Sequence, residues 1–243
     1  MASWDQWLIV IPARLQSTRL PEKPLQDLAG KPLIIRVQEQ LQKLKHMGAT
    51  IVVATDSDKV LAVCKSHGVH GVLTSVEHQS GTDRVHEVSQ GYPHRYILNV
   101  QGDEPFVDID DLDRLAEAME VKNDIGMGTL VYSNQNQGDF ENPNVVKAII
   151  SEDKKALYFS RSPIPFHRDN AFQKFWQHQG IYAYTRKTLD AFCKLQQHPL
   201  EELEKLEQLR ALGFGIDILA IEAMKPSIGI DTPKDLEEAR EKY

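Results

Sequence analysis

The sequence lacks several features that would assign it to a protein class at once. Its 243 residues contain no apolar run long enough to span a membrane, so membrane insertion is not expected. The first residues lack the basic segment and apolar core of a signal peptide. The two cysteines, Cys64 and Cys193, form no CxxC pair and have no histidine at ligand spacing. This pattern favours buried, apolar thiols in a reducing compartment, so we expect a cytosolic protein.

An excess of positive charge is also missing. The formal net charge is -7, which argues against a nucleic-acid partner. Two phosphate-binding motifs are absent as well, because the sequence has neither a GxxxxGK[ST] loop nor a GxGxxG segment after a strand. A locally positive segment can nevertheless bind phosphate in an acidic protein.

Short apolar runs alternate with segments of helical periodicity through the first half of the chain. This alternation predicts an α/β fold with a doubly wound, mostly parallel sheet. With no internal repeat, low-complexity tract or Gly/Ser linker, we expect a single domain over residues 1–243. The predicted strands are 7–12, 50–55, 70–74 and 95–100, and the predicted helices are 32–48, 56–68, 82–91 and 108–122.

The pattern loosens after residue 124. Extended, prolyl and aromatic segments predict a strand-rich arm or subdomain at about 125–190. Its aromatic content exceeds what an arm can bury by itself, which favours a symmetric dimer. A helix over 200–213, a strand over 216–223 and a helix over 231–242 follow, the last with Thr232 as its cap. The aromatic residues in question are Phe159, Phe166, Phe172, Phe175 and Trp176.

Polar stretches follow three of the predicted strands, at the edge where ligands bind in open α/β sheets. They read ARLQSTRLPEK, EHQSGTDR and QGDEP. The first contains Arg14, Arg19 and Lys23, and Lys31 comes shortly after it. Prolines stiffen this segment, which favours a loop that wraps an anion over the alternative of a solvated basic loop.

Two aspartates are candidates for a metal site. Asp103 follows a buried strand beside Gly102, and Asp231 lies between an apolar stretch and a helix. A carboxylate in such a place can hold a divalent metal against phosphate oxygens. Each aspartate alone is more often a turn or capping residue. Their convergence across the sheet would make the site.

The order of motifs resembles the 3-deoxy-manno-octulosonate (Kdo) cytidylyltransferases, the CMP-Kdo synthetases, over nearly the whole chain. The motifs are PARLQSTRLPEKPL, HQSGTDR, NVQGDEP, NPNVVKAI, ALYFSRSPIP, HQGIYAY, LEKLEQLR and GIDTPKDL. The resemblance implies a Rossmann-like nucleotidyltransferase fold with a dimerisation arm. It implies transfer of CMP from CTP to an eight-carbon sugar acid with release of pyrophosphate, for lipopolysaccharide biosynthesis. It also implies Mg²⁺ as cofactor and a homodimer.

The same resemblance implies roles for individual residues. The nucleotide would be bound by Ala13, Arg14, Arg19, Lys23, Ser80, Gly81, Thr82 and Gln101, with Arg14, Arg19, Lys23 and Asp103 as catalytic residues. Asp103 and Asp231 would bind Mg²⁺. The sugar acid would contact Gln101, Arg161, His178, Tyr182, Glu207 and Gln208, with Arg161 as the best carboxylate partner. Alternatively, Tyr182 is a core residue, His178 is structural, and Glu207 and Gln208 are surface residues.

The sequence departs from the family pattern at three places. Glu22 stands where relatives often have glycine, Gln179 where leucine is frequent, and Gly213 where a bulkier residue is common. These departures leave open a modified octulosonate, such as an 8-amino form. A sialic acid is a second alternative substrate. A non-catalytic nucleotide-binding module is the alternative of a different class, and the combination of Lys23 with Asp103 and Asp231 argues against it.

Overall fold

The computed structural model describes residues 1–122, 124–168 and 172–243, and it divides into two compact units. The first unit comprises Ser3–Ile109 together with Ser227–Tyr243, and the second comprises Met1–Ala2 together with Asp110–Pro226. The predicted arm at 125–190 falls within the second unit, and its residues 169–171 lie outside the described residues. The single-domain organisation stays a prediction.

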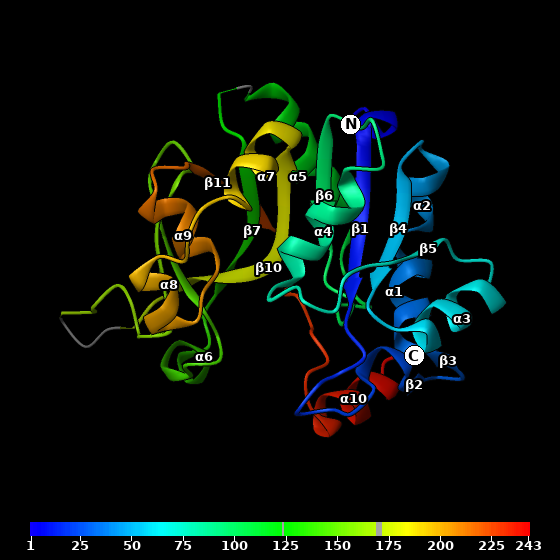
Figure 1. Cartoon of the computed structure of the whole chain (residues 1–243). Helices are drawn as coiled ribbons and strands as arrows, with labels where there is room; N and C mark the ends of the chain where they lie inside the picture. The colour runs from blue at the N-terminus through cyan, green and yellow to red at the C-terminus, as the bar shows by residue number, and fades with distance from the viewer. Residues whose placement is uncertain (123, 169–171) are drawn as a thin grey trace. The chain divides into compact units, whose positions relative to one another are not determined.

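The first unit contains a parallel sheet in the order β6-β1-β4-β5 (Figure 1). Helix α4 packs against β1 on one face of this sheet. Every predicted strand and helix of this part is present, although the helix predicted at 32–48 divides in two at Leu41. The strands are β1 (Trp7–Ala13), β2 (Asp27–Leu28), β3 (Lys31–Pro32), β4 (Thr50–Thr55), β5 (Gly71–Leu73) and β6 (Tyr96–Asn99). The helices are η1 (Trp4–Gln6), η2 (Lys23–Leu25), α1 (Leu33–Gln40), α2 (Gln42–His46), α3 (Asp58–Ser66), α4 (Gly81–Ser89) and α10 (Pro233–Arg240).

The core of the first unit forms around β1. Its residues Trp7 to Ile11 are fully buried, as expected of a central parallel strand with both faces covered. The rings of Trp7 and Tyr96 stack with centroids 4.8 Å apart across the β1–β6 pair. This buried strand fixes the start of the polar loop that follows Ala13.

The C-terminal segment returns to the first unit and ends in α10. Thr232 caps this helix by accepting a hydrogen bond from the Asp235 amide, as predicted. The Arg240 guanidinium donates to the Asp27 carbonyl, so α10 lies beside β2 (Figure 1). The Ile230 amide donates to the Asp103 carbonyl at 2.9 Å, which ties the segment before α10 to the loop after β6.

The second unit contains a mixed sheet. Strand β7 pairs parallel with β11 and antiparallel with β10, while β8 pairs antiparallel with β10 and β9. The strands are β7 (Met127–Asn134), β8 (Lys147–Ile150), β9 (Ala156–Ser160), β10 (Phe175–Thr185) and β11 (Ile218–Ala223). The helices are α5 (Ile109–Val121), α6 (Gln137–Glu141), α7 (Arg186–Phe192), α8 (Pro199–Glu204) and α9 (Gln208–Gly213). The predicted α/β class with mostly parallel pairing is confirmed.

The continuous helix predicted at 200–213 is wrong. Lys205 adopts a left-handed backbone conformation with φ of 52°, which separates α8 from α9. The Arg161 guanidinium donates to the carbonyls of Glu204 and Lys205 and so satisfies backbone groups at this break. Tertiary contacts therefore override a local helical periodicity.

The apolar surface available for a partner is smaller than the sequence indicated. Phe159 and Phe175 are buried within the second unit, whereas Phe166 is 85% exposed. The homodimer stays a prediction. Among the described residues, no helix has the length and apolar character needed to cross a membrane.

The thiols of the two cysteines are expected to react at different rates. Cys64 is fully buried in α3, and burial raises the pKa of its thiol to about 11, whereas Cys193 is half-buried. Iodoacetamide at mildly alkaline pH should therefore modify Cys193 first and Cys64 slower by about a hundredfold or more. Mass spectrometry of proteolytic peptides measures both rates. In concentrated guanidinium chloride the two should converge, and equal rates in the native protein would contradict this prediction.

Candidate functional site

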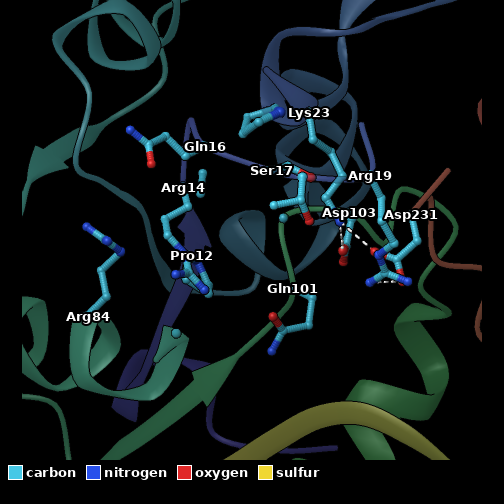
Figure 2. A pocket seen from close by; sticks show the side chains of 15 residues that line it. Pro12, Arg14, Gln16, Ser17, Arg19, Lys23, Arg84, Gln101, Asp103 and Asp231 are labelled. Atoms are coloured by element: carbon cyan, nitrogen blue, oxygen red, sulfur yellow. Dashed lines mark hydrogen bonds and ion pairs between the residues drawn. The ribbon is translucent and has the colours of Figure 1, made fainter. Parts of the chain in front are cut away.

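A cavity of about 370 Å³ lies in the first unit, where the loops after β1 and β6 meet the start of α4 and the segment before α10 (Figure 2). Four cationic and two anionic side chains line it, so its fixed charge is positive although the chain as a whole is acidic. Such a local field attracts a polyanion. The charged residues are Arg14, Arg19, Lys23, Arg84, Asp103 and Asp231.

The loop after β1 is anchored by a buried ion pair that the sequence analysis did not identify. The Leu15 amide donates to Asp56 Oδ1 at 3.2 Å, and Arg84 Nη2 donates to Asp56 Oδ2 at 3.0 Å. Arg84 is 1% exposed and also donates to the Thr74 hydroxyl. The sequence could have indicated this role, because Arg84 is the last residue of the HQSGTDR motif and lies one turn after Gly81 at the start of a helix.

Arg14 and Arg84 add positive potential to the same side of the cavity (Figure 2). Burial is the main reason that the pKa of Arg84 lies below its ordinary value, and the charge of Arg14 lowers it further. Arg84 stays charged at neutral pH. Arg14 is exposed and forms no ion pair with any residue that the structure describes. Its guanidinium is therefore available to an anion.

Asp103 and Asp231, the two candidate metal ligands, both contact the same Lys23 ammonium. The hypothesis of a metal site at this pair depends on such a convergence. Lys23 Nζ lies 2.5 Å from Asp103 Oδ2 and 2.8 Å from Asp231 Oδ1. Arg19 Nη2 lies 3.1 Å from Asp231 Oδ2. Figure 2 shows these contacts as dashed lines on the side of the cavity opposite Arg84.

The donor chemistry of the pair fits a hard divalent cation. Carboxylate oxygens from two loops approach one positive centre, and Mg²⁺ binds through one or two carboxylates plus substrate oxygens. Over the described ranges, no set of three or more His, Cys, Asp or Glu side chains is arranged to hold a metal. A cation at this pair would therefore need further oxygens from a substrate.

A third carboxyl, that of Glu104, is buried next to Asp103 in the chain. Burial, with help from the nearby Asp103, raises the pKa of Glu104 to about 8. Its Oε2 atom is buried and has no hydrogen-bond partner among the residues described. The Glu104 carboxyl is therefore mostly protonated at neutral pH and adds little negative charge to the site.

Close packing sets the position of the loop that carries Asp103. A Cβ atom at Gly102 would lie 2.7 Å from the Pro12 carbonyl oxygen, so only glycine fits without a shift of the backbone. Ala13 and Gln101 line the cavity next to it, and Gln101 Nε2 is 3.4 Å from Asn99 Oδ1. The loops after β1 and β6 therefore approach each other directly.

Ser80, Gly81 and Thr82 are the three residues that we expected to contact the cytosine base. Of these, Gly81 lines the cavity. The Ser80 hydroxyl accepts a hydrogen bond from the Asp83 amide and caps α4. Thr82 is buried. Three uncharged residues that the sequence analysis did not assign, Gln16, Ser17 and Thr18, also line this cavity.

The residues expected at the sugar acid, apart from Gln101, belong to the second unit. His178 and Tyr182 lie on β10 with ring centroids 5.4 Å apart. Burial lowers the pKa of His178 to about 3, so the ring is neutral, and its Nε2 lies 3.2 Å from the Thr129 hydroxyl. Tyr182 and Gln208 are buried, and Gln208 is therefore no surface residue.

Arg161 has extensive backbone contacts. Its guanidinium donates to the carbonyls of Pro143, Glu204 and Lys205. It therefore braces the break between α8 and α9, next to Glu207 at the start of α9.

The three departures from the family pattern have local explanations. Glu22 has a left-handed backbone with φ of 51°, which glycine adopts at no steric cost. Its carboxylate pairs with Lys59 Nζ at 2.6 Å, and neither residue lines the cavity. Gln179 donates to the Lys225 carbonyl, and a Cβ atom at Gly213 would lie 2.5 Å from the His198 ring.

Comparison with known proteins gives consistent results. A family model described as cytidylyltransferase matches residues 8–218. The 3-deoxy-manno-octulosonate cytidylyltransferase of Wolinella succinogenes is 45% identical, covering 96% of this chain and 97% of that protein. The corresponding protein of Neisseria meningitidis serogroup C is 41% identical, covering 97% of each.

Solved structures agree with these relatives. A CMP:2-keto-3-deoxy-manno-octonic acid synthetase complexed with CTP matches with a TM-score of 0.91 and 37% identity, covering 97% of each chain. HddC from Yersinia pseudotuberculosis matches with a TM-score of 0.69 at 17% identity over 97% of this chain and 98% of that one, which shows a likeness of fold alone. The chain belongs to the 3-deoxy-manno-octulosonate cytidylyltransferase family.

Proposed function

We propose that the protein transfers CMP from CTP to 3-deoxy-manno-octulosonate, giving CMP-Kdo and pyrophosphate for lipopolysaccharide biosynthesis. The observation that carries this proposal is the cavity of the first unit, whose four cations and paired carboxylates suit a nucleoside triphosphate with a divalent metal. Membership of the family supplies the substrate pair. The non-catalytic alternative does not account for a carboxylate pair beside the cations.

The nucleotide lies in this cavity in our proposal. Arg14, Arg19 and Lys23 hold the triphosphate and stabilise the charge of the departing pyrophosphate. Ala13 and Gln101 line the nucleotide, while Ser80, Gly81 and Thr82 form the cytosine pocket. Arg84 holds the loop after β1 in place through Asp56, and it adds its positive charge to the cavity.

Asp103 and Asp231 would hold Mg²⁺. When bound, the ion would neutralise phosphate charge and favour the ionised form of the attacking hydroxyl. The two aspartates lie on the side of the cavity opposite Arg84 (Figure 2).

The reaction is an in-line displacement at phosphorus. The anomeric hydroxyl of the sugar acid attacks the α-phosphorus, a new O–P bond forms, and the bond to the pyrophosphate oxygen breaks. The hydroxyl proton leaves to solvent. The protein contributes mainly by positioning the reactants and by stabilising charge. The cations of the loop after β1 stabilise the negative charge that accumulates on pyrophosphate.

We propose that the sugar acid is contacted by Arg161, His178, Tyr182, Glu207, Gln208 and Gln101. Because burial lowers the pKa of His178 to about 3, this side chain can offer the sugar only a neutral hydrogen bond. A homodimer is the proposed assembly.

A direct assay tests the proposed function. Pyrophosphate release from CTP and Mg²⁺ is measured with Kdo, 8-amino-Kdo and a sialic acid as acceptors. We expect the highest kcat/KM with Kdo. A preference for another acceptor would replace the substrate assignment, and release with none of them would contradict the proposed activity.

The two halves of the site should respond differently to substitution. Lys23→Met removes a charge-assisted contact to phosphate, typically worth about 1.5–3 kcal/mol. Lys23 must give up contacts with carboxylates when it binds phosphate, so the loss of binding energy should lie at the lower end of this range. The KM for CTP should then rise about tenfold. Arg161→Lys should instead raise the KM for Kdo, because an ammonium cannot reproduce a bidentate fork.

Two-substrate kinetics of both variants measures these effects. Lys59→Met, which removes a lysine paired with Glu22 outside the cavity, is the control and should leave both constants near their wild-type values. If Lys23→Met weakened only the sugar, or Arg161→Lys only CTP, the division of roles would be wrong.

A further inference from the structure

The Lys23 ammonium has two possible sets of partners, the carboxylates and the phosphates, that compete for its N–H donors. In the structure it lies between Asp103 Oδ2 and Asp231 Oδ1, at 2.5 and 2.8 Å. Two of its three N–H donors go to these carboxylates, which leaves one for phosphate. If the ammonium is to bind the triphosphate through more than one donor, it must give up a carboxylate.

The position held by Lys23 is also the position that a divalent metal requires. Both aspartates direct an oxygen at the Nζ atom, and a cation placed between the two carboxylates would meet the same two oxygens. The ammonium and the metal therefore compete for one place. A unit charge in contact with two carboxylates in a partly buried site is a strong competitor.

The charges of the cluster balance as they stand. Lys23 and Arg19 carry two positive charges, and Asp103 and Asp231 carry two negative charges. The Lys23 side chain is only 17% exposed. A metal added alone would leave Lys23 and Arg19 without counter-charges.

The backbone at Lys23 is fixed, so a change of partner falls to its side chain. Lys23 opens the short helix η2, in which the Gln26 amide donates to the Lys23 carbonyl at 3.2 Å, and Pro24 beside it is buried. A four-carbon stem can swing between the carboxylates and the cavity without moving the loop.

We propose that Lys23 is a placeholder cation. Its ammonium holds Asp103 and Asp231 together in place of the metal, and it gives them up when a triphosphate offers it new partners. The metal is then admitted together with the nucleotide, and binds poorly without it. This inference rests on the proposed role of the two aspartates as metal ligands.

Metal binding without nucleotide tests the exchange directly. Free Mn²⁺ is measured by electron paramagnetic resonance in titrations of wild type, Lys23→Met, Lys23→Arg and Lys59→Met. Lys23→Met should bind Mn²⁺ about tenfold more tightly than wild type or better, because the competing charge is gone. Lys23→Arg keeps a cation between the carboxylates and should stay weak.

The controls separate the site from general charge effects. Lys59→Met changes the net charge equally but leaves the carboxylate pair intact, so its Mn²⁺ affinity should equal that of wild type. A second substitution, Asp231→Asn in Lys23→Met, should abolish the gain. Mn²⁺ binding by Lys23→Met no tighter than by wild type, or equal tightening in Lys59→Met, would overturn the proposal.

A second measurement needs no variant. Binding to the native state raises the melting temperature, so Mg²⁺ alone should leave that of the wild-type protein nearly unchanged, whereas Mg²⁺ with CTP should raise it. A large increase with Mg²⁺ alone would also overturn the proposal. Neither readout depends on turnover, and the acceptor assay tests the proposed function separately.

Discussion

Replacement of Asp103 by asparagine is expected to lower kcat by about a thousandfold or more while the protein stays folded. In the proposed mechanism the aspartate pair holds the metal, and metal charge contributes several kcal/mol of transition-state stabilisation, which corresponds to about three powers of ten in rate. The amide keeps the size of the side chain but loses its charge. Asp231→Asn should have a similar effect.

Steady-state rates at saturating CTP, Kdo and Mg²⁺ measure this loss, and circular dichroism checks the fold. Asp217→Asn serves as the matched control, because Asp217 is an exposed aspartate of the second unit that pairs with Lys155. It should retain wild-type activity. Turnover within a few-fold of wild type in Asp103→Asn would remove the assignment of the pair to a metal.

Replacement of either partner of the Glu201–Arg210 pair is expected to destabilise the second unit by about 3–5 kcal/mol, because the remaining charge is left buried. Both side chains are 8% exposed, and two hydrogen bonds of 2.8 and 2.6 Å join them. The guanidinium also lies over the Phe192 ring, 5.0 Å from its centroid. Glu201→Leu and Arg210→Met are the single variants.

Urea unfolding measures these costs, and the double variant provides the decisive comparison. Glu201→Leu/Arg210→Met leaves no unpaired charge and should recover most of the lost free energy of unfolding. Asp217→Ala breaks the exposed pair with Lys155 and should cost about 1 kcal/mol or less. A double variant as unstable as the sum of the two singles would show that the buried charge is not the cause.

The strands were the most predictable part of this chain. The segment predicted at 50–55 coincides with β4, because a parallel strand buried on both faces is a continuous apolar run. The break at Lys205 was not predictable, since the apolar spacing continues through it and the stabilising Arg161 is far away in sequence. The local sequence pattern around Lys205 does not indicate that a hydrogen-bond donor from elsewhere in the chain stabilises the break.

The candidate site was predictable in its location and less so in its internal contacts. Topology alone places the loops after β1 and β6 at one edge of the sheet. The placement of Lys23 between Asp103 and Asp231 depends on three segments that meet only in the folded chain. The anchoring of Leu15 by Asp56 required the same tertiary information.

The return of Ser227–Tyr243 to the first unit has a consequence for synthesis on the ribosome. Asp103 is synthesised early. The segment that carries Asp231, which contacts the same Lys23 ammonium, emerges only after the whole of Asp110–Pro226. At ordinary translation rates this delay is on the order of ten seconds. A nascent chain therefore carries the loop after β1 without its second carboxylate until Ser227–Tyr243 has left the ribosome, and the proposed turnover of CTP must wait for that segment.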